Sequence, residues 1–129
     1  MLYHIHASIN HTTSGYSTRT HHICKSLIES GVDLHVRTRW GYPCDRAENS
    51  LKPNEITTDI LDGVTYLHDP EEEAFGTYAM EDYAQRAAYS LLTSALEIRP
   101  AVIHAASNHS VGFPAAMVAK ALSIPFVYE

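Results

Sequence analysis

Apolar side chains along this chain either alternate with polar ones or recur at helical spacing, and these patterns predict its elements. Residues 1–7 alternate aliphatic and polar side chains and predict a first strand. Residues 8–15 are rich in Ser, Thr, Asn and Gly, as expected of a loop. Over residues 16–30 the apolar positions lie on one helical face, and Gly31 is placed to end that helix.

The middle of the chain predicts a second strand, a loop and a hairpin. Residues 32–39 predict the strand, and residues 40–56, with two prolines and no periodicity, predict the loop. Residues 56–61 and 64–68 predict two short strands around Asp62-Gly63, a pair favoured in tight hairpin turns.

The remainder of the chain predicts helices in alternation with strands. Residues 75–98 carry apolar side chains near helical spacing and predict a long helix that ends before Pro100. Residues 101–105 predict a buried strand, residues 111–122 a helix with a face of small side chains, and residues 123–129 a last strand.

The alternation of strands and helices predicts an α/β fold with a mainly parallel sheet that is covered on both faces. Right-handed crossovers would make it a Rossmann-like three-layer α/β/α domain. The hairpin around Asp62-Gly63 should be its one antiparallel feature, at an edge of the sheet. A chain of 129 residues is long enough for one such domain and too short for two.

Ligands of such sheets bind beyond the carboxyl ends of the strands, and this rule selects three loops. The first contains Ser14, Gly15, Tyr16 and Arg19 and leads into a helix. A helix N-terminus suits a phosphate, and a glycine lets the backbone approach a ligand closely, although a glycine turn with a serine cap explains the segment equally well. Neither the G-x-G-x-x-G of dinucleotide sites nor a Walker-type Gly-Lys-Ser/Thr is present.

The second loop follows residue 39 and joins a cation to two aromatic rings. Sugar rings stack on aromatic faces, and Arg39 could hold hydroxyls or a phosphate. The alternative is that Trp40 and Tyr42 pack the loop onto the sheet, which we favour for Trp40.

The third loop places imidazoles and hydrogen-bonding groups at a strand end before a helix. His104 can be a satisfied core histidine, whereas His109 is the better candidate for chemistry at the solvent side. Ser107 and Asn108 between them add a hydroxyl and an amide.

Composition narrows the classes of partner. The formal net charge of −6 argues against nucleic acid, which requires a basic face. The acidic run from Asp69 to Glu73 suggests a solvated loop. Two cysteines, Cys24 and Cys44, are expected to be thiols in a reducing cytoplasm, and neither a secretory signal nor an apolar run of membrane-spanning length is present.

Nine histidines raise the question of a metal. His4 and His6 share a strand face, while the adjacent His21 and His22 point to different sides of a helix. No Cys-x-x-Cys or His-Glu-x-x-His spacing occurs, so we expect no dedicated metal site and no cofactor.

Five stretches occur in a characteristic order. They are Ser14-Gly15-Tyr16 through Arg19-Thr20-His21 to Leu27 and Gly31; Thr38-Arg39 with Gly41-Tyr42-Pro43; Asp62-Gly63-Val64 with Tyr66; Arg99 to Ala105 followed by Ala115; and Ile124 to Glu129. Together they resemble the N-terminal, acceptor-side domain of the family 4 glycosyltransferases of the GT-B fold, over essentially the whole chain. Their order and spacing carry the resemblance, because no single stretch is specific.

The resemblance implies transfer of a sugar from a nucleotide sugar, with retention of anomeric configuration, to a glycan or a lipid-linked saccharide, as in polysaccharide biosynthesis. It implies that the loop with Gly15 lies at an interdomain cleft near the donor phosphates. The residues expected on the acceptor side are Arg39, Trp40, Tyr42, His104, Ser107, Asn108 and His109. Members often have His-x-His where this chain has His104-Ala105-Ala106, and catalytic residues stay undefined, with His109 as a candidate.

The family carries its nucleotide-binding glutamate and basic residues in a second domain, which this chain lacks. We therefore expect residues 1–129 to be a truncated domain that is inactive alone, from a cytoplasmic parent enzyme that is either free or peripheral at the inner membrane face. The alternatives are a non-catalytic, flavodoxin-like binding domain and another GT-B enzyme such as an epimerase or phosphorylase. The sugar, the acceptor and the oligomeric state are left open.

Overall fold

The computed structural model describes residues 1–46, 51–53, 57–71 and 74–129, which form one six-stranded sheet and three helices. In chain order the elements are β1 (Leu2–Ile5), α1 (Gly15–Glu29), β2 (His35–Gly41), β3 (Thr58–Leu61), β4 (Val64–Pro70), α2 (Met80–Ile98), β5 (Ile103–Ala106), α3 (His109–Leu122) and β6 (Phe126–Tyr128). The strand order across the sheet is β3-β4-β2-β1-β5-β6.

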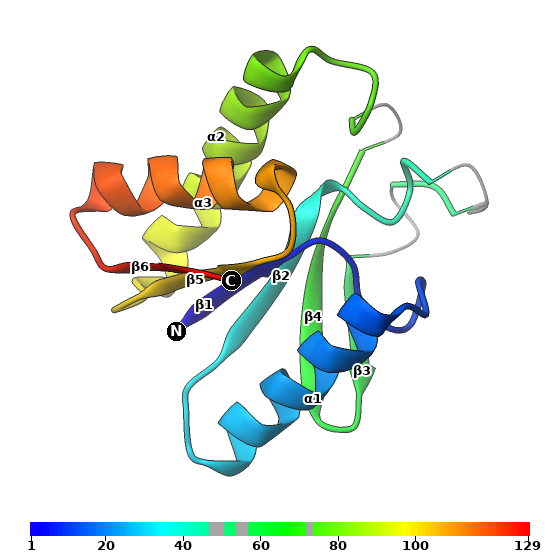
Figure 1. The fold of residues 1–129 in the computed structure, drawn as a ribbon, viewed down its shortest axis with the longest axis vertical. Coiled ribbons are helices and arrows are strands. Elements are labelled where there is room, and N and C mark those ends of the chain that lie inside the picture. Colours follow the sequence, from blue (N-terminus) through cyan, green and yellow to red (C-terminus); the bar gives the residue numbers. More distant parts are fainter. Residues whose placement is uncertain (47–50, 54–56, 72–73) are drawn as a thin grey trace.

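The sheet is parallel except at one edge. β4, β2, β1, β5 and β6 pair in parallel, and only β3 runs antiparallel, against β4. Helix α1 lies on one face of the sheet, and α2 and α3 lie together on the other (Figure 1). The prediction of a Rossmann-like α/β/α fold with a mainly parallel sheet is confirmed.

The edge hairpin forms where the sequence predicts it. Leu61 and Val64 pair around the two-residue turn, and Asp62 and Gly63 have φ angles of 49° and 81°. Two positive φ angles in succession are what a type I′ turn requires, and an Asp-Gly pair adopts them at low cost. β3 is the outermost strand, as expected of this hairpin.

The connections create a switch point between β1 and β5. From β1 the chain moves outward through β2 to β4, and α2 then carries it back over the sheet to β5, on the other side of β1. Ile5 and Ala106, at the carboxyl ends of these two strands, pair with each other. In open α/β sheets a ligand crevice forms at such a point, because the connections leave in opposite directions.

A separate apolar cluster lies on each face of the sheet, because successive side chains of a strand point to opposite faces. Leu2 joins Leu91 and Ile103 under α2 and α3, whereas the neighbouring Tyr3 joins Cys24 and Tyr66 under α1. Apolar packing therefore covers both faces of the sheet, and the candidate ligand-binding groups lie at the ends of the strands.

Two segments differ from their predicted structure. Helix α2 begins at Met80 instead of residue 75, because Gly76 turns the backbone with a φ angle of 87°. Asp69 belongs to β4 and not to a solvated loop, since its carboxylate pairs with the Arg37 guanidinium at 2.9 Å. The predictions for residue 56 and for Glu72 and Glu73 lie outside the described residues.

The thiols and helices give two further findings within the described residues. Cys24 and Cys44 do not form a disulfide, as the sequence predicts. None of the described helices combines the length and the apolar character needed to cross a bilayer.

Candidate functional site

A cleft opens at the switch point, between the start of α1 and the loop that joins β5 to α3. It has a volume of about 600 Å³. A smaller hollow of about 210 Å³ shares its central residues His6, Tyr16, Thr20, Ala106 and Ser107. The residues that line the larger cleft are His6, Tyr16, Arg19, Thr20, Ala106, Ser107, Asn108 and Glu129.

The wall formed by α1 is a capped helix start. The Ser17 amide donates to Ser14 Oγ at 3.2 Å, and the Ser14 amide donates to Ser17 Oγ at 2.9 Å, which makes a reciprocal capping box. Among the described residues, no partner accepts from the amides of Gly15 and Tyr16. These amides and the positive end of the helix dipole suit an anion at this wall.

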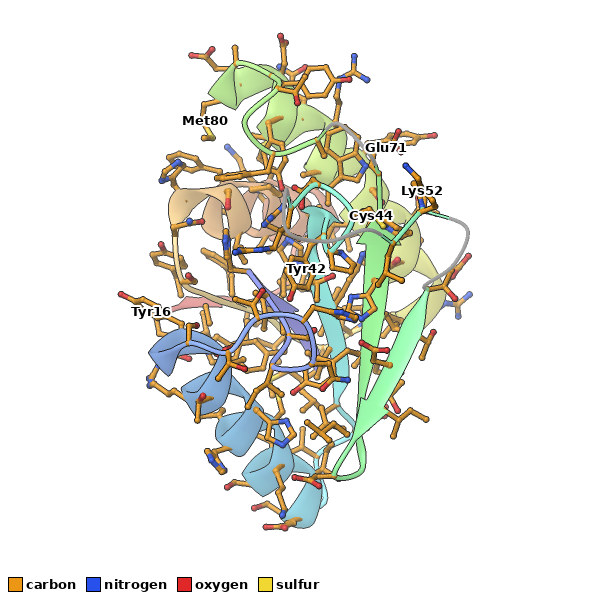
Figure 2. The ribbon with its side chains drawn as sticks, turned by 90° about the vertical axis from the view of Figure 1, so that its right-hand side faces the viewer. Tyr16, Tyr42, Cys44, Lys52, Glu71 and Met80 are labelled. Atoms are coloured by element: carbon orange, nitrogen blue, oxygen red, sulfur yellow. The ribbon has the colours of Figure 1, made fainter. Side chains whose placement is uncertain are left out.

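Gly15 and Tyr16 leave this wall open. A Cβ added to Gly15 would meet no atom within 4 Å, and its φ angle is not positive. A positive φ angle is therefore not a reason for glycine at residue 15, and the open space leaves room for a ligand to approach the backbone closely. Tyr16 is 72% exposed and projects outward from the helix start (Figure 2).

The opposite wall contains a strained residue. Ser107 has a φ angle of 99°, which non-glycine residues rarely adopt and which costs on the order of 1–3 kcal/mol. Its backbone is held there on both sides, since its amide donates to Glu129 O at 3.1 Å and its carbonyl accepts from Tyr128 Oη at 2.6 Å. Such strain persists where the surrounding structure imposes it, and it concentrates at functional sites.

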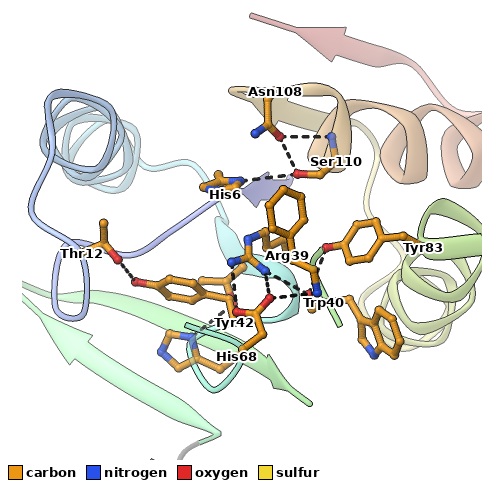
Figure 3. A network of polar contacts seen from close by, with 12 residues as sticks. His6, Thr12, Arg39, Trp40, Tyr42, His68, Tyr83, Asn108 and Ser110 are labelled. Carbon is orange, nitrogen blue, oxygen red and sulfur yellow. Dashed lines mark hydrogen bonds and ion pairs between the residues drawn. The ribbon is translucent and has the colours of Figure 1, made fainter. Parts of the chain in front are cut away.

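Asn108 and His6 also line the cleft. Asn108 caps α3 by accepting from the Ser110 amide at 3.1 Å, so its oxygen is engaged. His6 Nδ1 lies 3.5 Å from Ser110 Oγ (Figure 3). Burial, followed by the nearby Arg39 charge, lowers the pKa of His6 to about 4. His6 is therefore neutral at pH 7 and can both donate and accept a hydrogen bond.

The base of the cleft holds a carboxylate with several donors. Glu129 Oε1 accepts from Tyr3 Oη at 2.7 Å, and Glu129 Oε2 accepts from Arg19 Nη2 at 2.7 Å. Burial acts to raise the pKa of Glu129, but the hydrogen bonds from Tyr3 and Arg19 outweigh it and hold that pKa below its usual value. The Arg19 guanidinium is thereby fixed at the cleft mouth, with more than half of its side chain exposed.

His104 lies beneath this group. Its ring stacks on Tyr3 with centroids 4.3 Å apart, and its Nε2 is 3.6 Å from Glu129 Oε1, beyond hydrogen-bond distance. Burial lowers the pKa of His104. The interpretation of His104 as a satisfied core histidine is wrong, because among the described residues Nε2 has no hydrogen-bond partner.

Arg39 and Trp40, at the end of β2, do not line the cleft. Arg39 is 2% exposed, and its guanidinium pairs with both carboxylate oxygens of Asp45 while lying 4.7 Å from the centre of the Phe75 ring (Figure 3). This placement corrects the expectation that Arg39 offers its guanidinium to a ligand. Trp40 packs against Tyr83, with ring centres 5.7 Å apart, in agreement with the packing alternative.

Tyr42 supports the cleft from behind instead of lining it. Its side chain is buried, and its hydroxyl donates to Ser8 O at 3.1 Å. Because the phenol has only one proton, the Thr12 hydroxyl must be the donor in the 2.9 Å contact with Tyr42 Oη. Tyr42 thus fastens residues 8–12, which precede the capped start of α1.

His109 faces a different hollow. It is exposed on the first turn of α3 and lines a mainly apolar hollow of about 340 Å³ together with Phe113, Phe126 and Tyr128. The cleft brings together Tyr16, Arg19, Ser107 and Asn108 from the predicted set, and His109 is not among its lining residues.

Sequence reasoning missed three cleft residues. His6 directly follows β1, so the rule on carboxyl ends could have found it. Thr20 lies one helical turn after Tyr16, a spacing that places both on one side of α1. Glu129 gives no signal in the sequence, because its contacts with Tyr3 span 126 residues.

Comparisons with known proteins find likeness in structure alone. No protein-family model and no curated protein matches the chain in sequence. Sucrose-phosphate synthase from Thermosynechococcus elongatus superposes with a TM-score of 0.67 at 8% identity, over 98% of this chain and 32% of that chain. MurG from Acinetobacter baumannii superposes with a TM-score of 0.59 at 15% identity, over 98% of this chain and 33% of that chain.

Both structures are GT-B glycosyltransferases, and the chain spans about one third of each. Identities of 8% and 15% establish a common fold and do not test the narrower resemblance to family 4. The chain therefore has the Rossmann-like fold found in GT-B glycosyltransferases.

Proposed function

We propose that this chain is the acceptor-side half of a glycosyltransferase and that the cleft between β1 and β5 is its contribution to the active site. The observation that carries the proposal is the convergence of two helix N-termini, those of α1 and α3, on one polar cleft at the switch point of a GT-B-like sheet. A nucleotide-sugar donor brings phosphates and hydroxyls, which are the groups that such a cleft can hold.

Each wall has its own task in this proposal. The uncapped amides of Gly15 and Tyr16, next to the Ser14 cap, and the Arg19 guanidinium face the donor phosphates. Ser107 and Asn108 hold hydroxyls of the acceptor, and neutral His6 accepts or donates a hydrogen bond beside them. Glu129 orients Arg19 and keeps its charge at the cleft mouth.

The finer assignments belong to the same proposal. We propose a family 4 enzyme that retains anomeric configuration and transfers a hexose to a glycan or lipid-linked acceptor, in the cytoplasm or at the inner membrane face. A second domain would supply the nucleotide-binding residues and close the cleft. Support comes from the order of the sequence stretches from Ser14 to Glu129 and from the GT-B fold of both structural neighbours.

The chain alone is expected not to bind nucleotide sugars to saturation, because in this proposal a second domain supplies the nucleotide-binding residues and closes the cleft. Calorimetric titration of the 129-residue chain with uridine and guanosine diphosphate sugars checks this. Tight binding by the chain alone would favour the alternative of a self-sufficient, flavodoxin-like binding domain.

In the complete enzyme, Arg19→Ala is expected to lower kcat/KM by about ten- to a hundredfold, which corresponds to roughly 1.5–3 kcal/mol for one charge-assisted contact. Gly15→Val is expected to lower kcat at least about tenfold while the fold survives, since open space surrounds residue 15. Steady-state kinetics on nucleotide-sugar turnover measure both effects, and circular dichroism checks folding.

The matched control is Arg86→Ala, which removes an exposed arginine from α2, outside the cleft. It should leave kcat/KM unchanged. Parent-like turnover by both cleft variants would show that the walls are only structural and would overturn the proposal.

A further inference from the structure

Three side chains of types that bind metal ions lie close together, and they come from three separate segments of the chain. They are His11 in the loop after β1, Asp59 on β3 and His68 on β4, and their ligand atoms all lie within 4.8 Å of one another. Asp59 Oδ2 is 2.6 Å from His11 Nε2 and 3.1 Å from His68 Nε2. None of the three side chains lines the cleft or the smaller hollow beside it.

The strand pairing and the path of the chain bring these three side chains together. Asp59 pairs with Tyr66 across the β3–β4 hairpin, so Asp59, Tyr66 and, two residues on, His68 share one face of the sheet. Tyr66 contacts His21 of α1 on that face, its hydroxyl being 2.6 Å from His21 Nδ1. The loop that leads into α1 crosses the same face and brings in His11.

We propose that His11, Asp59 and His68 form a binding site for a divalent transition-metal ion, with Zn²⁺ as the best fit. Two imidazole nitrogens and one carboxylate oxygen are a ligand set that Zn²⁺ accepts, and bonds of about 2.0–2.2 Å place tetrahedral ligand atoms roughly 3.3 Å apart. The two observed distances to Asp59 Oδ2 are 2.6 and 3.1 Å, so these two pairs need to open by less than 1 Å, and the two imidazole nitrogens lie within 4.8 Å of each other.

The burial of the three side chains suits such a rearrangement. His68 is fully enclosed, whereas the His11 and Asp59 side chains are 18% and 20% exposed. The enclosed ligand fixes the position of the site, and the two partly exposed ligands can adjust. Water from the exposed side completes the fourth position.

Thr38 orients the enclosed ligand. Its Oγ1 lies 3.2 Å from His68 Nδ1 and 3.5 Å from Leu67 O. If Nδ1–H donates to the threonine oxygen and the threonine hydroxyl donates to the carbonyl, the lone pair of Nε2 is left for the metal. Ligating histidines are commonly held in this way through their second nitrogen.

A metal at this point would join the edge hairpin to the loop that precedes α1. The same loop is fastened at Ser8 and Thr12 by Tyr42. The ion would therefore strengthen the contact that His11 already makes with Asp59, and with it the attachment of the segment that precedes the α1 wall of the cleft. Because its ligands include two imidazoles, the site should prefer Zn²⁺, Co²⁺ or Cu²⁺ to Mg²⁺ or Ca²⁺, which take oxygen ligands.

The test uses the full chain without a polyhistidine tag, stripped of metal with a chelator. Calorimetric titration with Zn²⁺ is expected to show one site per chain, and Co²⁺ is expected to give the intense visible absorption of tetrahedral coordination. Mg²⁺ should give no saturable signal. Zn²⁺ should also raise the Tm, because it binds the folded chain.

Asp59→Asn and His68→Gln should each raise the Kd for Zn²⁺ at least about tenfold and abolish the tetrahedral Co²⁺ spectrum. Thr38→Val keeps all three ligands and should raise the Kd by about ten- to a hundredfold, since it removes only the partner of Nδ1. The control His35→Gln removes a partly buried histidine whose Nε2 lies 3.3 Å from Asp33 Oδ1, and it should leave both signals intact.

Circular dichroism of the metal-free proteins shows whether each variant folds, and any variant that does not is replaced by His11→Gln at the partly exposed ligand. Absence of a tetrahedral Co²⁺ spectrum in the parent chain would overturn the proposal. So would Zn²⁺ binding that His35→Gln reduces as much as Asp59→Asn does.

Discussion

Arg39→Ala is expected to lower the free energy of unfolding by about 3–5 kcal/mol, a large share of the total stability of a domain of this size. The Arg39 and Asp45 side chains are 2% and 1% exposed, and the guanidinium bonds both carboxylate oxygens. Truncation leaves the Asp45 carboxylate buried and without its cation, with the Phe75 amide still donating to Oδ2 at 3.2 Å. An uncompensated buried charge is the physical cause of the loss.

Urea denaturation followed by circular dichroism measures this loss. The double variant Arg39→Met with Asp45→Asn should cost less than the sum of the two single variants, because it removes both charges together. Arg86→Ala is the matched control: Arg86 is exposed, and its guanidinium lies 4.7 Å from the centre of the partly buried Tyr78 ring, a contact that should contribute less than about 1 kcal/mol. Equal costs for Arg39→Ala and Arg86→Ala would contradict the importance of the buried pair.

Gly41→Ala is expected to cost about 2–5 kcal/mol, the second large effect. Gly41 has a φ angle of 90°, where a side chain costs about 1–2 kcal/mol. An added Cβ would also overlap the Ala74 methyl group and come within 3.0 Å of an Asp45 carboxylate oxygen. Overpacking of this kind costs about 1–3 kcal/mol more, and it displaces the partner of Arg39.

Gly31→Ala is the control that separates strain from overlap. Gly31 has a similar φ angle of 83°, but a Cβ there would meet nothing within 4 Å, so only the strain of about 1–2 kcal/mol should appear. Urea denaturation of both variants gives the comparison. If Gly31→Ala is as damaging as Gly41→Ala, overlap with Ala74 and Asp45 plays no part.

Arg39 influences the cleft from its buried position without lining it. Its guanidinium does not touch a ligand, yet its charge helps to lower the pKa of His6, which lines the cleft. Arg39 is therefore a positioning and electrostatic residue. The turn after β2 also carries Tyr42, which bonds Ser8 and Thr12. Loss of the Arg39–Asp45 pair should therefore disturb residues 8–12 and, through them, the α1 wall of the cleft.

Local patterns in the sequence predicted most of the elements. The strand at β1, the helix at α1 and the hairpin around Asp62-Gly63 depend on side-chain periodicity and on residues that tolerate positive φ angles, both of which are visible within a few positions. The start of α2 was misjudged, because the apolar residues before Met80 resemble a helix but pack as a turn against Tyr83.

The sequence by itself determined the order of strands and helices in this protein, and with it the edge of the sheet at which a cleft would form. Only the tertiary structure decided which polar side chains reach that cleft. Arg39 is buried because Asp45 and Phe75 enclose it, whereas Glu129 enters because it meets Tyr3 across 126 residues. His11 meets Asp59 across 48 residues in the same way. Contacts at such separations follow from strand pairing and helix placement, and no local pattern encodes them.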